Sequence, residues 1–205
     1  MRLLALFSVF MVLGVGTATQ QSSPGLSERE QDTYAVYSVL MSRPPTSWGN
    51  DPNEMYAIAA ETRVIRRGTF DLVSCIQLSA EYDARWKEIL SEIDSGSDSP
   101  TTLQRSLKIG KPYTFLAGDE LKRFEDSVRS RGIQAPVAGD TPLKGAVDIF
   151  FLSNVYFDKT RTLALVQLTS VCGMLCGEVD SKVYEKGTNG AWLEVRPLRF
   201  CAVYF

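Results

Sequence analysis

Apolar residues recur along this chain with two different periods, which predict helices in the first half and strands in the last third. Tyr34, Tyr37 and Met41 are spaced by three and four residues, which is typical of the buried face of a helix. Ser27 and Glu30 have the spacing of a capping box, in which each side chain satisfies a backbone donor of the first turn. We therefore expect a helix to begin at Ser27 and to bury its aromatic face.

Two further helices are predicted, over residues 82–93 and 119–131. Their apolar positions fall on one side at helical spacing: Trp86, Ile89, Leu90 and Ile93 in the first, and Leu121, Phe124 and Val128 in the second. Gly132 is placed to be the C-terminal cap of the second helix. Between the first helix and these two, residues 55–66 alternate imperfectly and are interpreted as a strand.

The last third is rich in strands. Four are predicted, over residues 146–157, 162–171, 179–186 and 192–204. Residues 158–161 form a polar turn between the first two, and Asn189-Gly190 is a strong hairpin signal between the last two. Because helices come first and strands follow, the predicted fold class is α+β, with two or three helices packed on a C-terminal antiparallel β-meander. Residues 28–205 are expected to form this single domain.

The N-terminal segment has the pattern of an export signal. Arg2 precedes an uncharged apolar run over residues 3–15, and Gly16 and Ala18 are the small residues that signal peptidase prefers. We expect residues 1–18 to be a cleaved signal peptide and residues 19–27 a flexible leader. A buried N-terminal helix and an uncleaved anchor are the alternatives. No later segment is long and apolar enough to span a membrane, so a periplasmic or secreted protein is expected.

The amino-acid composition excludes several classes of binding and catalytic site. The chain has 205 residues, with 22 Lys and Arg against 24 Asp and Glu, which gives no basic face for nucleic acid. It contains no histidine, so Ser-His-Asp and Cys-His catalysis and His-ligated zinc are excluded. No glycine-rich phosphate loop and no metal-ligand cluster appears in the sequence, and neither a cofactor nor a metal is expected. A non-enzymatic role is therefore favoured.

The four cysteines are the sharpest feature. In an exported protein an even number of cysteines is interpreted first as disulfides, and four allow three pairings. We favour Cys172–Cys176, across a tight turn with glycines, together with Cys75–Cys201. A redox role is disfavoured because the spacing is not Cys-x-x-Cys. A four-cysteine zinc site is disfavoured because Cys75 and Cys201 are isolated in the sequence.

The C-terminal half resembles a group of uncharacterised exported bacterial proteins. The similarity lies in the strand Leu152–Asp158, the strand Thr162–Val166, the loop Cys172-Gly173-Met174-Leu175-Cys176-Gly177 and the hairpin Tyr184–Trp192. In that group these segments have the patterns L-S-x-V-x-F-[ND], T-x-A-L-V, C-G-x-L-C-G and L-x-K-x-x-G-x-W. The chain departs from the group at its end, residues 200–205, and at Glu178 after the loop. The group has no established activity, so the resemblance implies architecture and export but no chemistry.

Two functions follow as hypotheses. The first is a binding module that presents the cross-linked turn, with Met174 and Leu175 as apolar contacts and Glu178 and Asp180 beside them, to another envelope or extracellular protein. The alternative is that this turn only joins two strands. The second hypothesis is a hydrolase that uses paired carboxylates from Glu178, Asp180 and Glu185, for example on glycans.

Overall fold

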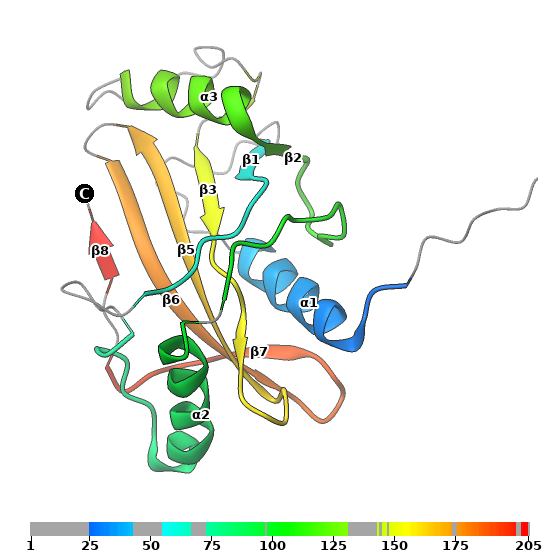
Figure 1. Cartoon of the computed structure of the whole chain (residues 1–205), viewed down its shortest axis with the longest axis vertical. Coiled ribbons are helices and arrows are strands. Elements are labelled where there is room, and N and C mark those ends of the chain that lie inside the picture. The colour runs from blue at the N-terminus through cyan, green and yellow to red at the C-terminus, as the bar shows by residue number, and fades with distance from the viewer. Residues whose placement is uncertain are drawn as a thin grey trace, which may run out of the picture.

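Three helices and one mixed sheet make up the part of the chain that the structure describes (Figure 1). The computed structural model describes residues 25–42, 55–66, 73–96, 98–130, 143, 145–146, 148–173, 176–199 and 202–204. The helices are α1 (Glu28–Ser42), α2 (Asp83–Asp94) and α3 (Gly118–Ser130). The strands are β1 (Tyr56–Ala59), β2 (Tyr113–Leu116), β3 (Ile149–Leu152), β4 (Tyr156–Phe157), β5 (Leu163–Gly173), β6 (Cys176–Lys186), β7 (Trp192–Val195) and β8 (Ala202–Tyr204).

The sheet joins a short parallel part to a longer antiparallel part. Its strand order is β2-β1-β3-β5-β6-β7, with β4 also paired to β5 and β8 also paired to β6. β1 runs parallel to β2 and to β3, whereas every pair from β3 to β8 is antiparallel. The long β5–β6 hairpin is the central antiparallel pair of the sheet, with β3 on one side and β7 on the other. The expected α+β class with antiparallel C-terminal strands is therefore confirmed.

The helices cover both faces of the sheet. On one face, α1 packs with side chains of β1, β3, β5, β6 and β7 in a single apolar cluster. On the other face, α2 packs against β4, β5 and β6, and α3 packs against β1, β2 and β3. Figure 1 shows α2 and α3 near opposite ends of the β5–β6 hairpin. β3, in the middle of the sheet, is therefore buried on both of its faces.

The first helix forms as its sequence predicts. The backbone N–H of Ser27 donates to Oε2 of Glu30 at 2.8 Å, and the Ser27 hydroxyl donates to the same oxygen at 2.7 Å. The N–H of Glu30 in turn donates to the Ser27 hydroxyl at 3.3 Å. Tyr34, Tyr37 and Met41 are buried. The capping box and the aromatic buried face are thus both confirmed.

The later helices are confirmed within a residue at each start. α2 begins at Asp83 after a 3₁₀ turn over Ala80–Tyr82, and α3 begins at Gly118. Ile89, Ile93, Phe124 and Val128 are buried on their apolar sides. The predicted cap Gly132 lies outside the described residues.

Two predicted strands are shorter or interrupted. Within residues 55–66 only β1 is continuous, and single bridges follow at Glu61 and Arg63. The predicted strand over residues 146–157 is divided into β3 and β4 by residues 153–155. The cause is visible at Ser153, whose N–H donates to the carbonyl of Gln167 at 2.9 Å while its hydroxyl accepts the N–H of Gln167 at 2.8 Å. A side chain therefore takes the place of one backbone partner at this position.

Two details at the ends of the sheet also correct the sequence prediction. β2 was not predicted from the sequence; its first three residues are partly buried and Leu116 is buried. The predicted strand over 192–204 is two strands, β7 and β8, which pair with different ends of β6. Leu198 and Arg199 instead donate backbone N–H groups to the carbonyl of Gln77, so this stretch leaves the sheet to pair elsewhere.

The turn between β4 and β5 is organised by one buried carboxylate. Oδ1 of Asp158 accepts the N–H groups of Thr162 at 2.7 Å and Leu163 at 2.8 Å, and Oδ2 accepts the Thr160 hydroxyl. Burial tends to raise the pKa of Asp158, but these hydrogen bonds outweigh it and hold the pKa below its usual value. The ionised form therefore stabilises the folded state at neutral pH, and this contribution is lost as the pH falls through the folded-state pKa.

We predict that Asp158→Asn lowers the free energy of unfolding by about 1 to 3 kcal/mol at pH 7, because an amide cannot accept every hydrogen bond of the carboxylate. Urea denaturation followed by circular dichroism measures this value. The difference from wild type should shrink in the acid range, where the wild-type carboxyl is protonated. Asp126→Asn, at an exposed position of α3, is the matched control. Equal stability of Asp158→Asn and the control at pH 7 would contradict the prediction.

Candidate functional site

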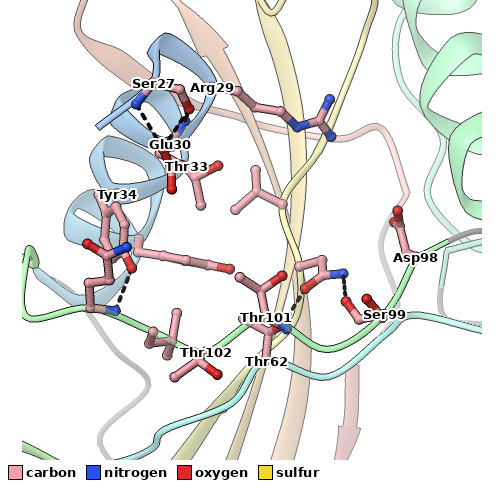
Figure 2. Close-up of a pocket in the computed structure, with 15 residues that line it drawn as sticks. Ser27, Arg29, Glu30, Thr33, Tyr34, Thr62, Asp98, Ser99, Thr101 and Thr102 are labelled. Carbon is pink, nitrogen blue, oxygen red and sulfur yellow. Dashed lines mark hydrogen bonds between the residues drawn. The ribbon is translucent and has the colours of Figure 1, made fainter. Parts of the chain in front are cut away.

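A polar pocket opens beside the N-terminal half of α1 (Figure 2). Its volume is about 340 Å³. Hydroxyl and amide side chains dominate its lining: Ser27, Thr33, Tyr34, Tyr37, Thr62, Ser99, Thr101, Thr102, Gln104 and Asn154. Arg29, Glu30 and Asp98 are the charged residues among those that line it. We call this hollow the polar pocket.

Figure 2 shows that two groups of residues face each other across this pocket. Ser27, Arg29, Glu30, Thr33 and Tyr34 come from α1 and its cap. On the opposite side lie Thr62, from the segment after β1, and four residues from the segment before β2, namely Asp98, Ser99, Thr101 and Thr102. The capping box is thus also part of the rim of the pocket.

The far wall is fixed by a hydrogen-bonded cluster. The Thr62 hydroxyl accepts the N–H of Thr101 at 2.7 Å and donates to Oδ1 of Asn154. The Nδ2 of Asn154 donates to the carbonyl of Ser99 at 3.0 Å. The backbone N–H of Leu103 donates to the carbonyl of Ala60 at 2.8 Å. Because three segments meet in this cluster, the wall is organised before any ligand arrives.

Two tyrosines hold α1 to the rest of the pocket. The Tyr34 hydroxyl accepts the backbone N–H of Gln104 at 2.6 Å. The buried Tyr37 hydroxyl donates to the carbonyl of Ser153 at 2.7 Å. Burial raises the pKa of both phenols above the usual value. Both hydroxyls are therefore neutral at physiological pH and act as positioning hydrogen-bond groups.

The three charged side chains at the rim of the pocket differ in their partners. The hydrogen bonds from the Ser27 hydroxyl and backbone lower the pKa of Glu30, which keeps this exposed carboxylate ionised. Arg29 forms an ion pair with Glu92 of α2, and its guanidinium lies 5.4 Å from the ring centroid of Phe157. Asp98 makes no ion pair with any residue in the described part of the chain. The pocket therefore carries an excess of negative charge.

The structure describes two of the four residues that the sequence predicted for the binding tip. Met174 and Leu175 lie outside the described residues. Glu178 is half-buried and pairs with Tyr204 of β8. Asp180 is 7% exposed and forms an ion pair with Lys182 at 2.9 Å. Burial tends to lower the pKa of Lys182, but its contacts with Asp180 and Glu194 outweigh burial and raise it. Asp180 is therefore a buried, ion-paired side chain of the sheet.

The three carboxylates of the hydrolase hypothesis do not share a cleft. Successive side chains of a strand point to opposite faces, and on β6 Tyr184 packs on the α1 side while Val183 packs on the α2 side. Glu178 and Asp180 therefore share the face of Tyr184. Glu185 lies on the other face, where it accepts hydrogen bonds from Arg85 at 2.8 Å and from Tyr82 at 2.9 Å.

The cysteines are oxidised where the structure describes them. Cys75 and Cys172 are each in a disulfide bond, and no free cysteine is found among the described residues. Cys201 and the side chain of Cys176 lie outside the described residues, so the favoured pairing stays a prediction. The described residues also contain no group of three or more His, Cys, Asp or Glu side chains placed to hold a metal ion.

Comparison with models of known protein families, with curated proteins and with solved structures finds no match for this chain. The resemblance to exported bacterial proteins therefore stays a prediction.

The polar pocket was not expected from the sequence. Its residues come from four separated parts of the chain, near positions 30, 62, 100 and 154. The capping box at Ser27 and Glu30 predicted a helix start, which is its usual meaning. Part of the far wall lies in the Ser-Gly-Ser-Asp-Ser-Pro run over residues 95–100, whose composition predicts a break between elements. Such a run is typical of loops and carries no signal for a binding site.

We predict that Asn154→Ala lowers the free energy of unfolding by about 1 to 3 kcal/mol, because the carbonyl of Ser99 and the hydroxyl of Thr62 both lose a partner. Hydrogen exchange at the N–H of Thr101 should become faster, since this amide depends on the same cluster. Asn189→Ala is the control, because Asn189 accepts one N–H in an exposed turn. Unchanged exchange at Thr101 would show that Asn154 does not organise the wall.

Proposed function

We propose that this protein is an exported, disulfide-stabilised binding module, and that the polar pocket binds a small neutral polyhydroxylated ligand, such as a sugar unit. The observation that carries this proposal is the lining of the pocket, in which hydroxyl and amide side chains face each other across a pre-formed wall. A volume of about 340 Å³ lies within the usual range for small-molecule sites.

The chemistry of the lining favours a neutral polyol. Thr33, Thr102 and Gln104 have side chains with no hydrogen bond to any described residue, so they are available to a ligand. Hydroxyl and amide groups both donate and accept, as the hydroxyls of a sugar do. Glu30 and Asp98 add charged acceptors, and they disfavour an anionic ligand.

The ionised state of Glu30 favours ligand binding over hydrolysis in this pocket. A general acid must carry a proton near the working pH. The hydrogen bonds from Ser27 lower the pKa of Glu30, so this side chain is ionised at neutral pH and serves as an acceptor. Tyr34 and Tyr37 stay protonated, and each is already held by a backbone group. The described pocket residues thus have the properties of ligand contacts.

Export rests on the N-terminal pattern and on the oxidised cysteines. Cys75 and Cys172 are disulfide-bonded, which agrees with an oxidising compartment. We further propose the pairings Cys172–Cys176 and Cys75–Cys201. The bridge between Gln77 and Arg199 supports the second pairing, because it brings the neighbourhoods of Cys75 and Cys201 together. Among the described residues, no helix has the length and apolar character needed to cross a membrane.

The pairing is tested by non-reducing peptide mapping of the exported protein. We expect one peptide pair that joins Cys75 to Cys201, and a Cys172–Cys176 bond within a single peptide. The protein should also begin near residue 19, since signal cleavage is expected after Ala18. A bond from Cys75 to Cys172 or Cys176 would overturn the pairing, and a retained N-terminal run would overturn the cleavage.

The ligand class is tested by calorimetric titration with a panel of neutral monosaccharides and short oligosaccharides. At least one should bind, and Thr33→Val should weaken it about fivefold, because one hydrogen bond contributes about 1 kcal/mol. Thr188→Val, in an exposed turn outside the pocket, is the matched control and should bind as wild type does. Binding unaffected by Thr33→Val, or no binding to any saccharide, would overturn the proposal.

A further inference from the structure

A second and larger hollow lies against α1, between this helix and the β6–β7 hairpin. Its volume is about 760 Å³, compared with about 340 Å³ for the polar pocket. We call it the α1–β7 groove. The residues that give it its character are Leu26, Asp32, Val39, Lys108, Lys186 and Trp192. Tyr34 lines both this groove and the polar pocket.

The floor of the groove is apolar. Trp192 is buried, and its ring lies 5.8 Å from the ring of Phe157, which fixes it in the core. Leu26 is half-buried beside the same cluster. Val39 is 37% exposed, and it is one of three large hydrophobic side chains that are exposed in the described part of the chain. Ala35, one turn before Val39, is partly buried against the same cluster, so an apolar ligand would cover Ala35 and Val39.

Asp32, Lys108 and Lys186 are the charged residues that line the groove. Asp32 is 10% exposed at its side chain and binds two cations, Lys186 and, at 3.3 Å, Arg161. Its negative charge is therefore already compensated. Lys108 has no carboxylate partner among the described residues. The groove consequently has one positive charge available to a ligand.

Lys108 is held at the groove by its own backbone. Its N–H donates to the hydroxyl of Ser38 on α1 at 2.9 Å, and that hydroxyl donates to the carbonyl of Tyr34 at 2.6 Å. The segment that carries Lys108 is therefore tied to the helix that forms one wall. The ammonium group remains on a flexible stem at the rim, where it can reach an anion without moving the backbone.

We propose that the α1–β7 groove binds a small apolar anion, with a hydrocarbon body on Ala35 and Val39 and a carboxylate at Lys108. An apolar floor with one converging charge is the usual composition of a small-molecule site, and the volume lies within the usual range. The groove and the polar pocket differ in charge and in polarity. This site therefore goes beyond the proposed function and does not depend on it.

The probes for this site are decanoate and 1-decanol, which share a chain of ten carbons and differ in charge. Nuclear magnetic resonance titration of the full exported protein measures the affinity and the place of binding together. Decanoate should shift the amide signals of residues 190–192 and should bind several-fold more tightly than decanol. Raising the salt concentration should weaken decanoate binding and leave decanol binding unchanged, since salt screens an exposed charge pair.

Variants separate the two contributions. Lys108→Gln should weaken decanoate binding about five- to tenfold and leave decanol unaffected. Lys122→Gln removes the same charge at an exposed position of α3 and should change neither. Val39→Asp, at an exposed position of α1, should weaken both probes, and circular dichroism checks that the helix is retained. Equal affinity for the two probes, or decanoate binding that Lys108→Gln leaves unchanged, would overturn the proposal.

Discussion

The two hollows exist because α1 is held across one face of the sheet by both apolar and charged contacts. Its tyrosines enter the core, and Tyr37 reaches the carbonyl of Ser153 between β3 and β4. Asp32 interrupts this apolar face, since it is a nearly buried carboxylate on the same helix. Such a charge is tolerated only where partners compensate it, and Arg161 does so from the β4–β5 turn and Lys186 from the end of β6. The helix is therefore fixed to the β4–β5 and β6–β7 ends of the sheet at once.

Arg161 shows what this anchoring requires of the backbone. It has φ 52°, a left-handed conformation that is unfavourable for a residue with a side chain. Its guanidinium binds Glu28 at 2.6 Å as well as Asp32, so the conformation aims the side chain at α1. The buried carboxylate of Asp158 holds the same turn from within. One tight turn thus fixes a helix that is distant in sequence, and the hollows on both sides of that helix depend on it.

The sequence predicts local features of this fold well, because their causes are local. The Ser27 and Glu30 cap, the two later helices and the β5–β6 hairpin all follow from spacing or turn chemistry. The parallel strands do not, because β3 is an unbroken Ile-Phe-Phe-Leu run in which successive residues alternate between two buried faces. Both faces are covered, so the run has no polar alternation that would reveal its direction or neighbours. The pairing of β1 with β2 and β3 is likewise a tertiary property.

The candidate sites could not be predicted from local sequence features. Residues from four parts of the chain form the polar pocket, and each of them has an ordinary structural meaning in its own segment. Thr33 and Lys108 each line only one of the two hollows, whereas Tyr34 lines both. The Tyr34 hydroxyl is fixed by Gln104 at the polar pocket, while the carbonyl of the same residue accepts the Ser38 hydroxyl that supports Lys108. A single residue of α1 therefore contacts the polar pocket through its hydroxyl and supports the cationic rim of the groove through its carbonyl, and both proposed sites depend on the position of this helix.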